Sequence, residues 1–433
     1  MYNSNIKISV DNIVITIIFL LPFLRYYNAP IVEVGFESLL TIVLFAACFL
    51  LCIAKPQFAI PKSLAQSRNW FILFVIWTIS VTIYYELFTD INLNSPIANY
   101  NMSALITPLI IAMVIFFILC GYVNTAKAIN IYSAFVTLVI AIYLFQWLLT
   151  LAGITIDFKL PFSYTSSWDY MNGKIMGMNA YPTSMFSEKS HFCEYLIPYV
   201  ALCLFSDKLI QKSRIKKSIF CSLVIASSVS GNGIVLLFIV WFMYFIFFAK
   251  FKNPGHKIIV AILGIILLVS AYFVLLKIPR FNEMFNELFV DNSGAQFENS
   301  KADYRIYRGL DIFSKMPLCG KTIGAGYKHM YLFSKKYTII SEFDFSWKTY
   351  EYFSAITMVL LYSGFIGAFA CLKHFAALFR SKVTVVRGLI IIMLALWFST
   401  EMLFNITHIM YITLIVAVLC QEKKAEDKLT LSN

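Results

Sequence analysis

Apolar segments as long as a bilayer is thick recur along this chain of 433 residues, and they constrain its fold more than any other feature. A helix that crosses a hydrocarbon core of roughly 30 Å needs about 20 predominantly apolar residues. Hydrophobic residues make up 60% of the chain and charged residues only 13%, whereas soluble domains have about 25% charged residues. The sequence therefore predicts an all-α polytopic membrane protein, with one membrane domain over residues 1–433. The expected spans are 10–27, 35–54, 70–88, 104–123, 131–152, 191–206, 218–230, 232–249, 257–277, 351–372, 388–403 and 406–420, about twelve transmembrane helices in all.

Two of the apolar runs, 218–249 and 388–420, are too long for one ordinary span. Polar residues interrupt each run near its middle, from Ser228 to Gly233 in the first and from Ser399 to Asn405 in the second. We interpret each run as a hairpin of two short helices. The alternative is one long tilted helix with a polar kink.

The basic residues support the hairpin interpretation. With the N-terminus in the cytoplasm, alternate connectors are rich in lysine and arginine, as the positive-inside rule requires, and the C-terminus is also cytoplasmic. These connectors carry Lys55, Lys62, Arg68, Lys127, Lys208, Lys212, Arg214, Lys216, Lys217, Lys250, Lys252, Lys257, Lys373, Arg380, Lys382 and Arg387. The net charge of +12 is thereby explained by membrane orientation, and we expect no nucleic-acid partner.

Two connectors on the opposite, extracytoplasmic side are long, at residues 154–190 and 278–350. The second holds ten Lys or Arg and eight Asp or Glu. Long loops within a compact protein are usually functional. We expect short amphipathic helices in the second loop, and we place the function of the protein in these two loops.

The cysteines and histidines give no sign of a metal site. The nine cysteines are scattered, mostly in apolar segments, and the five histidines are far apart in sequence. Neither a CxxC nor an HExxH spacing occurs. We therefore expect neither a metal ion nor a disulfide framework.

Glu188 and His191 are the first candidate catalytic residues. They stand three residues apart where the first long loop enters a span, and Glu194 continues the same stripe if the segment is helical. Such a pair could bind a sugar hydroxyl and accept its proton. An equally supported alternative is a helix N-terminus, with Ser187 or Ser190 as the cap and a glutamate near the positive helix end.

Arg305 and Arg308 are the second candidate pair. They lie in an amphipathic segment, 300–313, with Tyr304 among its aromatic members, and their spacing of three places them on one side of a helix. Arginine forks suit the oxygens of a diphosphate, and the glycines that follow permit close backbone approach. The alternative is a solvated helix with ion pairs to Asp303 and Asp311. Further candidate contacts in this loop are Arg280, Lys321, Gly324, Gly326 and His329.

Three histidines and one glutamate have weaker signals. His329 beside Lys328 could contact a phosphate, but an exposed pair on the loop surface is the better-supported interpretation. Glu401 and His408 lie near the turn of the last hairpin, where a substrate contact and an interhelical hydrogen bond are equally supported. His374 falls on the cytoplasmic side and is expected to be solvated.

These motifs resemble those of the Wzy-type polymerases, the bacterial enzymes that polymerise the repeat units of O-antigen, capsule and exopolysaccharide. The run from Phe186 to Pro198 resembles their "EPSHF…P" segment, with Lys189 where proline is usual. The hairpin turn from Ser228 to Gly233 is similar to their "S-x-S/T-x-G" element. The stretch from Arg308 to Gly326 is similar to their "R…P-L-x-G-x-G-x-G" loop, with a different glycine spacing.

The resemblance implies an inverting glycosyltransferase of GT-C-like architecture, related to the O-antigen ligases, that needs no metal and no cofactor. Its donor would be a glycan on polyprenyl diphosphate and its acceptor a lipid-linked repeat unit, joined at the outer face of the bacterial cytoplasmic membrane. Arg305 and Arg308 would stabilise the leaving diphosphate, and Glu188 or His191 would accept the proton. A flippase and a chain-length regulator are candidate partners.

Two other functions stay open from the sequence. An O-antigen ligase has similarly built loops, although the Ser190-His191-Phe192 segment favours a polymerase. A flippase for lipid-linked oligosaccharide would also have about twelve spans. We expect a flippase to show repeat symmetry between its halves and to lack a large outer loop.

Overall fold

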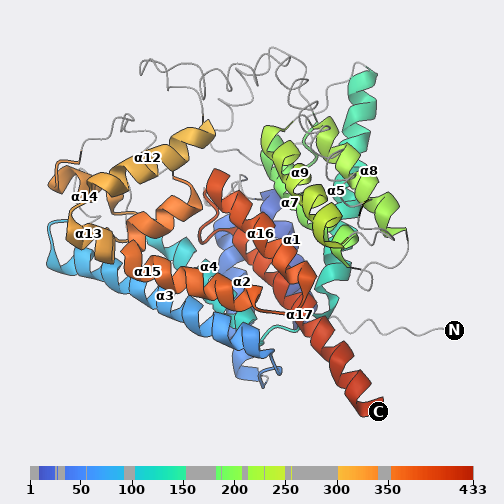
Figure 1. Ribbon diagram of the computed structural model, residues 1–433, viewed down its shortest axis with the longest axis horizontal. Coiled ribbons are helices and arrows are strands. Elements are labelled where there is room, and N and C mark those ends of the chain that lie inside the picture. Colours follow the sequence, from blue (N-terminus) through green and yellow to red (C-terminus); the bar gives the residue numbers. More distant parts are fainter. Residues whose placement is uncertain are drawn as a thin grey trace.

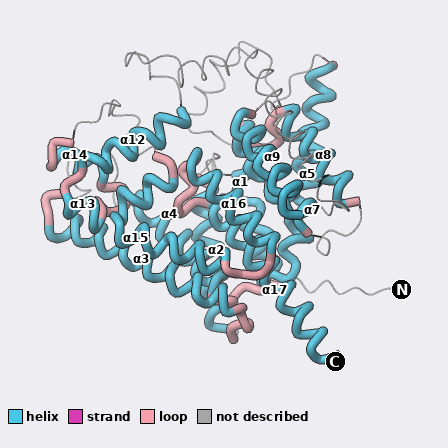
Figure 2. The backbone as a smooth tube through the Cα atoms, viewed as in Figure 1, coloured by secondary structure: helices cyan, strands magenta, loops and turns pink. Residues whose placement is uncertain are grey.

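The computed structural model describes residues 9–24, 27, 35–54, 56–91, 103–152, 182–186, 188–206, 213–228, 230–248, 255, 301–339 and 353–432. Every regular element within these residues is a helix, and none is a β-strand (Figures 1 and 2). The long helices form one bundle. The shorter helices α12, α13 and α14 lie together at one side of it (Figure 1).

The helices agree closely with the apolar segments of the sequence. Each expected span coincides with a helix, except 257–277, which lies outside the described residues. The helices of the first half are α1 (Val10–Leu24), α2 (Phe36–Ala54), α3 (Lys62–Phe88), α4 (Ser103–Leu119), the 3-10 turn η1 (Thr125–Lys127), α5 (Ala128–Leu151) and α7 (Lys189–Phe205). Those of the second half are α8 (Arg214–Ser227), α9 (Gly231–Met243) with the π-helical turn η2 (Tyr244–Phe248), α12 (Lys301–Lys315), α13 (Leu318–Ile323), α14 (Met330–Lys336), α15 (Ala355–Phe379), α16 (Thr384–Ser399) and α17 (Ile406–Ser432).

Both expected hairpin breaks are confirmed, because α8 and α9 are separate helices, as are α16 and α17. The amphipathic helix expected near 300–313 is present as α12.

Four helices are long and apolar enough to cross a membrane: Phe36–Ala54, Lys62–Phe88, Thr125–Leu151 and Ala355–Phe379. Several shorter apolar helices accompany them, so the described part of the chain is all-helical and has the apolar helices expected of a membrane protein.

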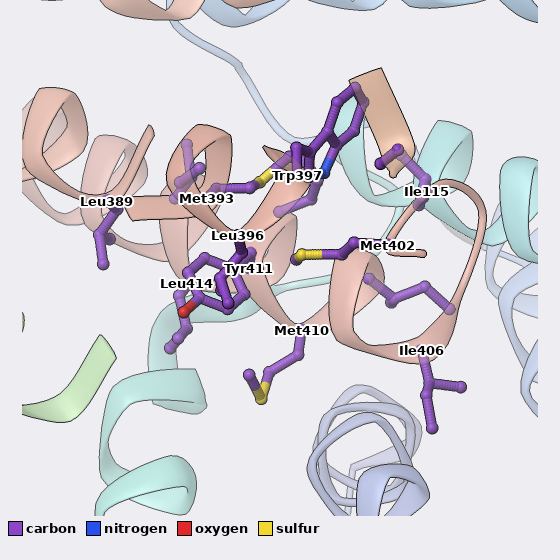
Figure 3. Packing of buried hydrophobic residues seen from close by; sticks show 14 of the residues in the cluster. Ile115, Leu389, Met393, Leu396, Trp397, Met402, Ile406, Met410, Tyr411 and Leu414 are labelled. Atoms are coloured by element: carbon purple, nitrogen blue, oxygen red, sulfur yellow. The ribbon is translucent and has the colours of Figure 1, made fainter. Parts of the chain in front are cut away.

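Helix α17 lies at the centre of the bundle. Every side chain from Ile406 to Leu419 is buried, and the helix contacts α1, α4, α5 and α16. Apolar residues of α16 and α17 interlock there with Ile115 of α4 (Figure 3). A helix that is apolar on all sides is stable only when it is surrounded, which explains its position.

Proline residues in the spans leave carbonyl oxygens without their usual helical donors, and tyrosine hydroxyls bond to the oxygens nearby. Pro198 of α7 has no N–H to give to the carbonyl of Glu194, four residues earlier. The Tyr411 hydroxyl of α17 donates to that oxygen at 3.4 Å, and the Tyr132 hydroxyl of α5 donates to the next carbonyl, that of Tyr195, at 2.5 Å. Two tyrosine hydroxyls therefore attach α7 to α5 and α17 in the turn before Pro198.

Helix α15 is interrupted at Gly364, which has φ 60° and ψ −166°. The interruption leaves carbonyls of α15 available to another segment. The Ala325 N–H donates to Leu361 O at 2.8 Å and the Gly326 N–H to Tyr362 O at 3.0 Å, so the segment after α13 is bonded to the break. Gly324, with φ +94°, makes the close approach possible, since a Cβ there would collide with Tyr362 O.

Replacing Gly324 by alanine should therefore destabilise the protein. The Cβ has to displace the backbone of α15, and a left-handed φ is strained for alanine, so we expect the unfolding free energy to fall by about 1–3 kcal/mol. Thermal melting of the purified protein in detergent measures the effect. Gly231→Ala is the matched control, because a Cβ at Gly231 meets nothing within 4 Å. Equal melting temperatures for Gly324→Ala and the unaltered protein would contradict this account.

Candidate functional site

A histidine and a glutamate form a pair at the start of α7. His191 Nδ1 lies 3.2 Å from Glu194 Oε2, and the two side chains are 20% and 6% exposed. Helical spacing of three residues brings them to one face of the helix. The pair thus joins an imidazole to a nearly buried carboxylate, an arrangement that holds the imidazole in one orientation.

The pair belongs to a network that crosses four helices. Asn232 Nδ2, at the start of α9, donates to Glu194 Oε1 at 3.4 Å, and Ser399 Oγ, at the end of α16, donates to Asn232 Oδ1 at 3.3 Å. Arg305 Nη1 of α12 donates to Ser399 O at 2.9 Å. A cation at the C-terminal end of a helix is favoured by the helix dipole. The network therefore links the segment of the first candidate pair with the arginine helix.

A narrow cleft lies beside the pair, with a cavity volume of about 10 Å³, which is room for about one water molecule. The residues that line it are Pro22, His191, Glu194, Tyr195, Ile406, Thr407 and Met410, from α1, α7 and α17. His191 carries the imidazole and Glu194 the carboxylate among these lining residues.

Glu188 occupies a different position from the one its spacing predicts. It is the N-cap residue of α7, with an extended backbone at φ −131° and ψ 152° and no side-chain capping bond, and it accepts a hydrogen bond from Ser190 Oγ at 3.0 Å. Ser190 lies inside the helix, so the expectation that it is the cap is wrong, and Ser187 is outside the described residues. The carboxylate bonded to His191 is that of Glu194.

The two arginines of α12 have unlike surroundings. Arg308 is fully buried, whereas Arg305 is partly exposed. Gly309 allows α12 to pack closely on α15, because a Cβ there would lie 2.5 Å from the Thr357 side chain. Asp311 forms an ion pair with Lys315, at 2.9 Å. Arg305 is thus the arginine that the structure places in the polar network.

The glycine segment after α13 binds the protein's own backbone. The Gly324 N–H donates to Gly320 O at 2.8 Å, and the next two N–H groups donate to α15. These amides are not available to the oxygens of a diphosphate. Lys321, on α13, is partly exposed.

His329 is fully buried, so the expected exposed pair with Lys328 is wrong. Its Nδ1 lies 2.8 Å from Tyr327 O, and its Nε2 lies 3.0 Å from Glu86 Oε2 of α3. Both ring nitrogens therefore lie within hydrogen-bond distance of an oxygen. His329 therefore attaches the start of α14 to α3, in a place where it meets no solvent.

His408 and His374 are also buried. His408 packs edge-on against Trp397 with ring centroids 5.4 Å apart, and within the described residues neither ring nitrogen has a hydrogen-bond partner. The expected interhelical hydrogen bond is therefore not observed. His374 contacts Ser67 Oγ at 2.8 Å through Nδ1, so the expectation that it is solvated is wrong.

Few or no contacts are described for the remaining candidates, Glu401, Tyr304 and Arg280. Glu401 is partly exposed, and its carbonyl accepts from Asn405 Nδ2 at 2.8 Å. The side chain of Tyr304 and all of Arg280 lie outside the described residues, and Asp303 has no described side chain. Within the part of the chain that the structure describes, no group of three histidine, cysteine or carboxylate side chains could hold a metal ion.

Asn232 and Ser399 are site residues that the sequence indicated only as turn residues. The available signal was a polar residue at the centre of a long apolar run. Such groups are costly in a membrane unless they face the protein interior or water, which already favours a buried polar network.

No family model and no curated protein matches this chain.

The buried pair of Glu86 and His329 should be strongly coupled. Removing one partner leaves a buried polar group without its counterpart, so Glu86→Ala and His329→Ala should each cost about 3–5 kcal/mol of stability. The double variant should cost less than the sum, with a coupling energy of about 1–3 kcal/mol. Chemical denaturation in detergent measures these values.

Lys336 and Asp90 form the matched control pair for this cycle. They lie 3.6 Å apart at the same edge of the protein, but their side chains are 38% and 99% exposed, so their coupling should be near zero. Additive losses for Glu86→Ala and His329→Ala would contradict the interaction.

Proposed function

We propose that this chain is a polysaccharide polymerase that joins polyprenyl-diphosphate-linked oligosaccharide repeat units. It would act at the outer face of the bacterial cytoplasmic membrane, with about twelve spans and a GT-C-like architecture. The observation that carries the proposal is the polar network from His191 and Glu194 through Asn232 and Ser399 to Arg305. The network links His191, the proposed proton acceptor beside the cleft, to Arg305, the proposed diphosphate contact.

His191 is the proposed general base. Its Nδ1–H donates to Glu194, which makes Nε2 the basic nitrogen of the neutral ring. The acceptor hydroxyl attacks the anomeric carbon of the donor glycan, the bond from that carbon to the diphosphate oxygen breaks, and the hydroxyl proton passes to His191. Glu194 stabilises the resulting imidazolium, as a carboxylate does in other oriented histidine pairs.

Arg305 is the proposed contact of the leaving diphosphate. Negative charge builds up on that group as the glycosidic bond breaks, and a guanidinium held in place lowers the barrier. One donor of Arg305 is bonded to Ser399 O, which holds the side chain, and the planar fork of a guanidinium matches the geometry of phosphate oxygens. Arg308 is buried, so we assign it a part in holding α12 in position.

The resemblance of the Phe186–Pro198 run supports a polymerase over the related ligases. Deletion of the gene followed by gel analysis of surface glycan separates the possible functions. A polymerase is indicated by loss of the ladder while one repeat unit stays attached. A ligase would leave polymer on the polyprenyl lipid, and a flippase would leave no glycan outside the cell.

Complementation of that deletion with variants tests the catalytic pair. We expect His191→Ala to reduce polymer formation by about 10²–10⁴-fold, because it removes the base. Glu194→Gln should also lose most of the ladder, since an amide does not stabilise the imidazolium. Glu188→Gln, the same change on the other side of His191, should keep the ladder. With equal expression of all proteins, a complete ladder from Glu194→Gln or His191→Ala would exclude this mechanism.

Labelling of a native cysteine tests the proposed orientation. Cys319 on α13 is exposed, whereas the other eight cysteines are buried or partly buried. A membrane-impermeant maleimide applied to intact spheroplasts should label the protein at Cys319, because the proposal puts α13 outside the cell. Cys319→Ser is the control and should abolish the signal. Labelling that appears only after the membrane is opened would place this loop, and the site, in the cytoplasm.

A further inference from the structure

A second cleft lies between α3 and α15 and shares no lining residue with the cleft beside His191. Its cavity volume is about 150 Å³, and its lining comes from Gln66, Asn69 and Trp70 of α3 and from Lys373, Ala376, Ala377 and Arg380 at the end of α15. The glycine segment and His329 contact the opposite end of α3, at Thr82 and Glu86. The second cleft therefore lies at the other end of α3 from the glycine segment and His329. The positive-inside pattern predicts that this end of α3 is cytoplasmic.

The lining is cationic and rich in hydrogen-bond donors. Lys373 and Arg380 are its charged residues, no Asp or Glu lines it, and within the described part of the chain neither cation has a salt bridge. Arg68 donates to Asn69 Oδ1 at 3.0 Å, which leaves the Asn69 amide to act as a donor. Such a set of donors matches the oxygens of a phosphate ester.

Apolar side chains border the cationic groups. The Lys373 ammonium lies 5.1 Å from the centre of the Phe369 ring, and Trp70 packs edge-on against that ring at 5.9 Å. Phe369 and Leu372 are 53% and 66% exposed. Large exposed apolar groups next to basic ones are suited to the boundary between acyl chains and headgroups, where tryptophan and lysine are favoured. A soluble phosphate would leave this apolar border without a role.

We propose that this cleft binds the headgroup of an anionic phospholipid. Lys373 and Arg380 bind the phosphate, Gln66 and Asn69 bind the polar headgroup, and an acyl chain extends along Phe369 and Leu372. Basic pockets between helices at the cytoplasmic side of a membrane bind anionic lipids in this manner. The binding is independent of the polymerase proposal, since it uses none of the residues of the candidate site.

Lipid retention by the purified full-length chain tests the proposal. Native mass spectrometry is carried out after incubation with phosphatidylglycerol or, separately, with phosphatidylcholine. We expect phosphatidylglycerol to be retained in preference. Since each basic group at a membrane surface contributes about a factor of five, Lys373→Gln with Arg380→Gln should weaken this retention by about thirty-fold. Lys373→Arg with Arg380→Lys keeps both charges and should restore it.

Lys216→Gln with Lys217→Gln is the matched control. These two exposed lysines begin α8, on the side that is also predicted to be cytoplasmic, and they do not line the cleft. Their loss should leave phosphatidylglycerol retention unchanged. Equal melting temperatures of all variants in phosphatidylcholine establish that each variant is folded.

Two outcomes would overturn the proposal. One is retention of phosphatidylglycerol by the Lys373→Gln, Arg380→Gln protein at the level of the unaltered chain. The other is complete displacement of the lipid by inorganic phosphate at equal concentration, which would identify the cleft as a site for soluble phosphate.

Discussion

The structure depends on one constraint, that a backbone group released from a helix within an apolar bundle has to be bonded by another element. No water is available in a hydrocarbon core to take that place. Pro198 releases a carbonyl in α7, and hydroxyls of α5 and α17 bond to α7 there. Gly364 interrupts α15, and the segment after α13 supplies N–H donors to it. Each irregularity thus determines which segments meet, and the two together position the elements around the candidate site.

The candidate site follows from the same constraint. Glu194, whose carbonyl accepts from Tyr411, directs its carboxylate toward His191 and Asn232, so the bonding around Pro198 of α7 and the polar network share one residue. The helix break before Asn232 and the end of α16 at Ser399 bring further polar groups to the same place. A buried network of this kind is stable only when its members are bonded, which makes the position of Arg305 sensitive to changes in four helices. Catalytic geometry and helix packing are therefore not separable in this region.

Much of the fold is predictable from hydrophobic pattern, while the partners within the site are not. Apolar length and polar interruptions correctly predicted the helices and both hairpin breaks, because these are local properties. Glu188 and Glu194 are equally spaced from His191, so spacing alone could not decide between them. The choice depends on where the helix begins, since the extended backbone of Glu188 removes it from the helical face. The burial of His329 depends on Glu86, 243 residues away, and no local signal reports such a contact. Gly364 likewise lies in a largely apolar run, where the adjacent Ser363 by itself does not indicate an interrupted helix.

Helix α15 extends from the glycine segment after α13 to the cationic cleft. Before Gly364 it contacts α12 and the segment after α13, and after Gly364 it carries His374, Lys373 and Arg380. The hydrogen bonds from Ala325 and Gly326 hold α15 at its interruption. In the part of α15 after Gly364, His374 forms a hydrogen bond with Ser67 of α3. Helix α3 thus contacts α15 on both sides of Gly364. Trp77 donates to Ser363 O before it, and Ser67 bonds to His374 after it. A shift of α15 against α3 would disturb the glycine segment at one end and the cationic cleft at the other. The glycine segment and the cationic cleft consequently depend on the same helix pair, α3 and α15.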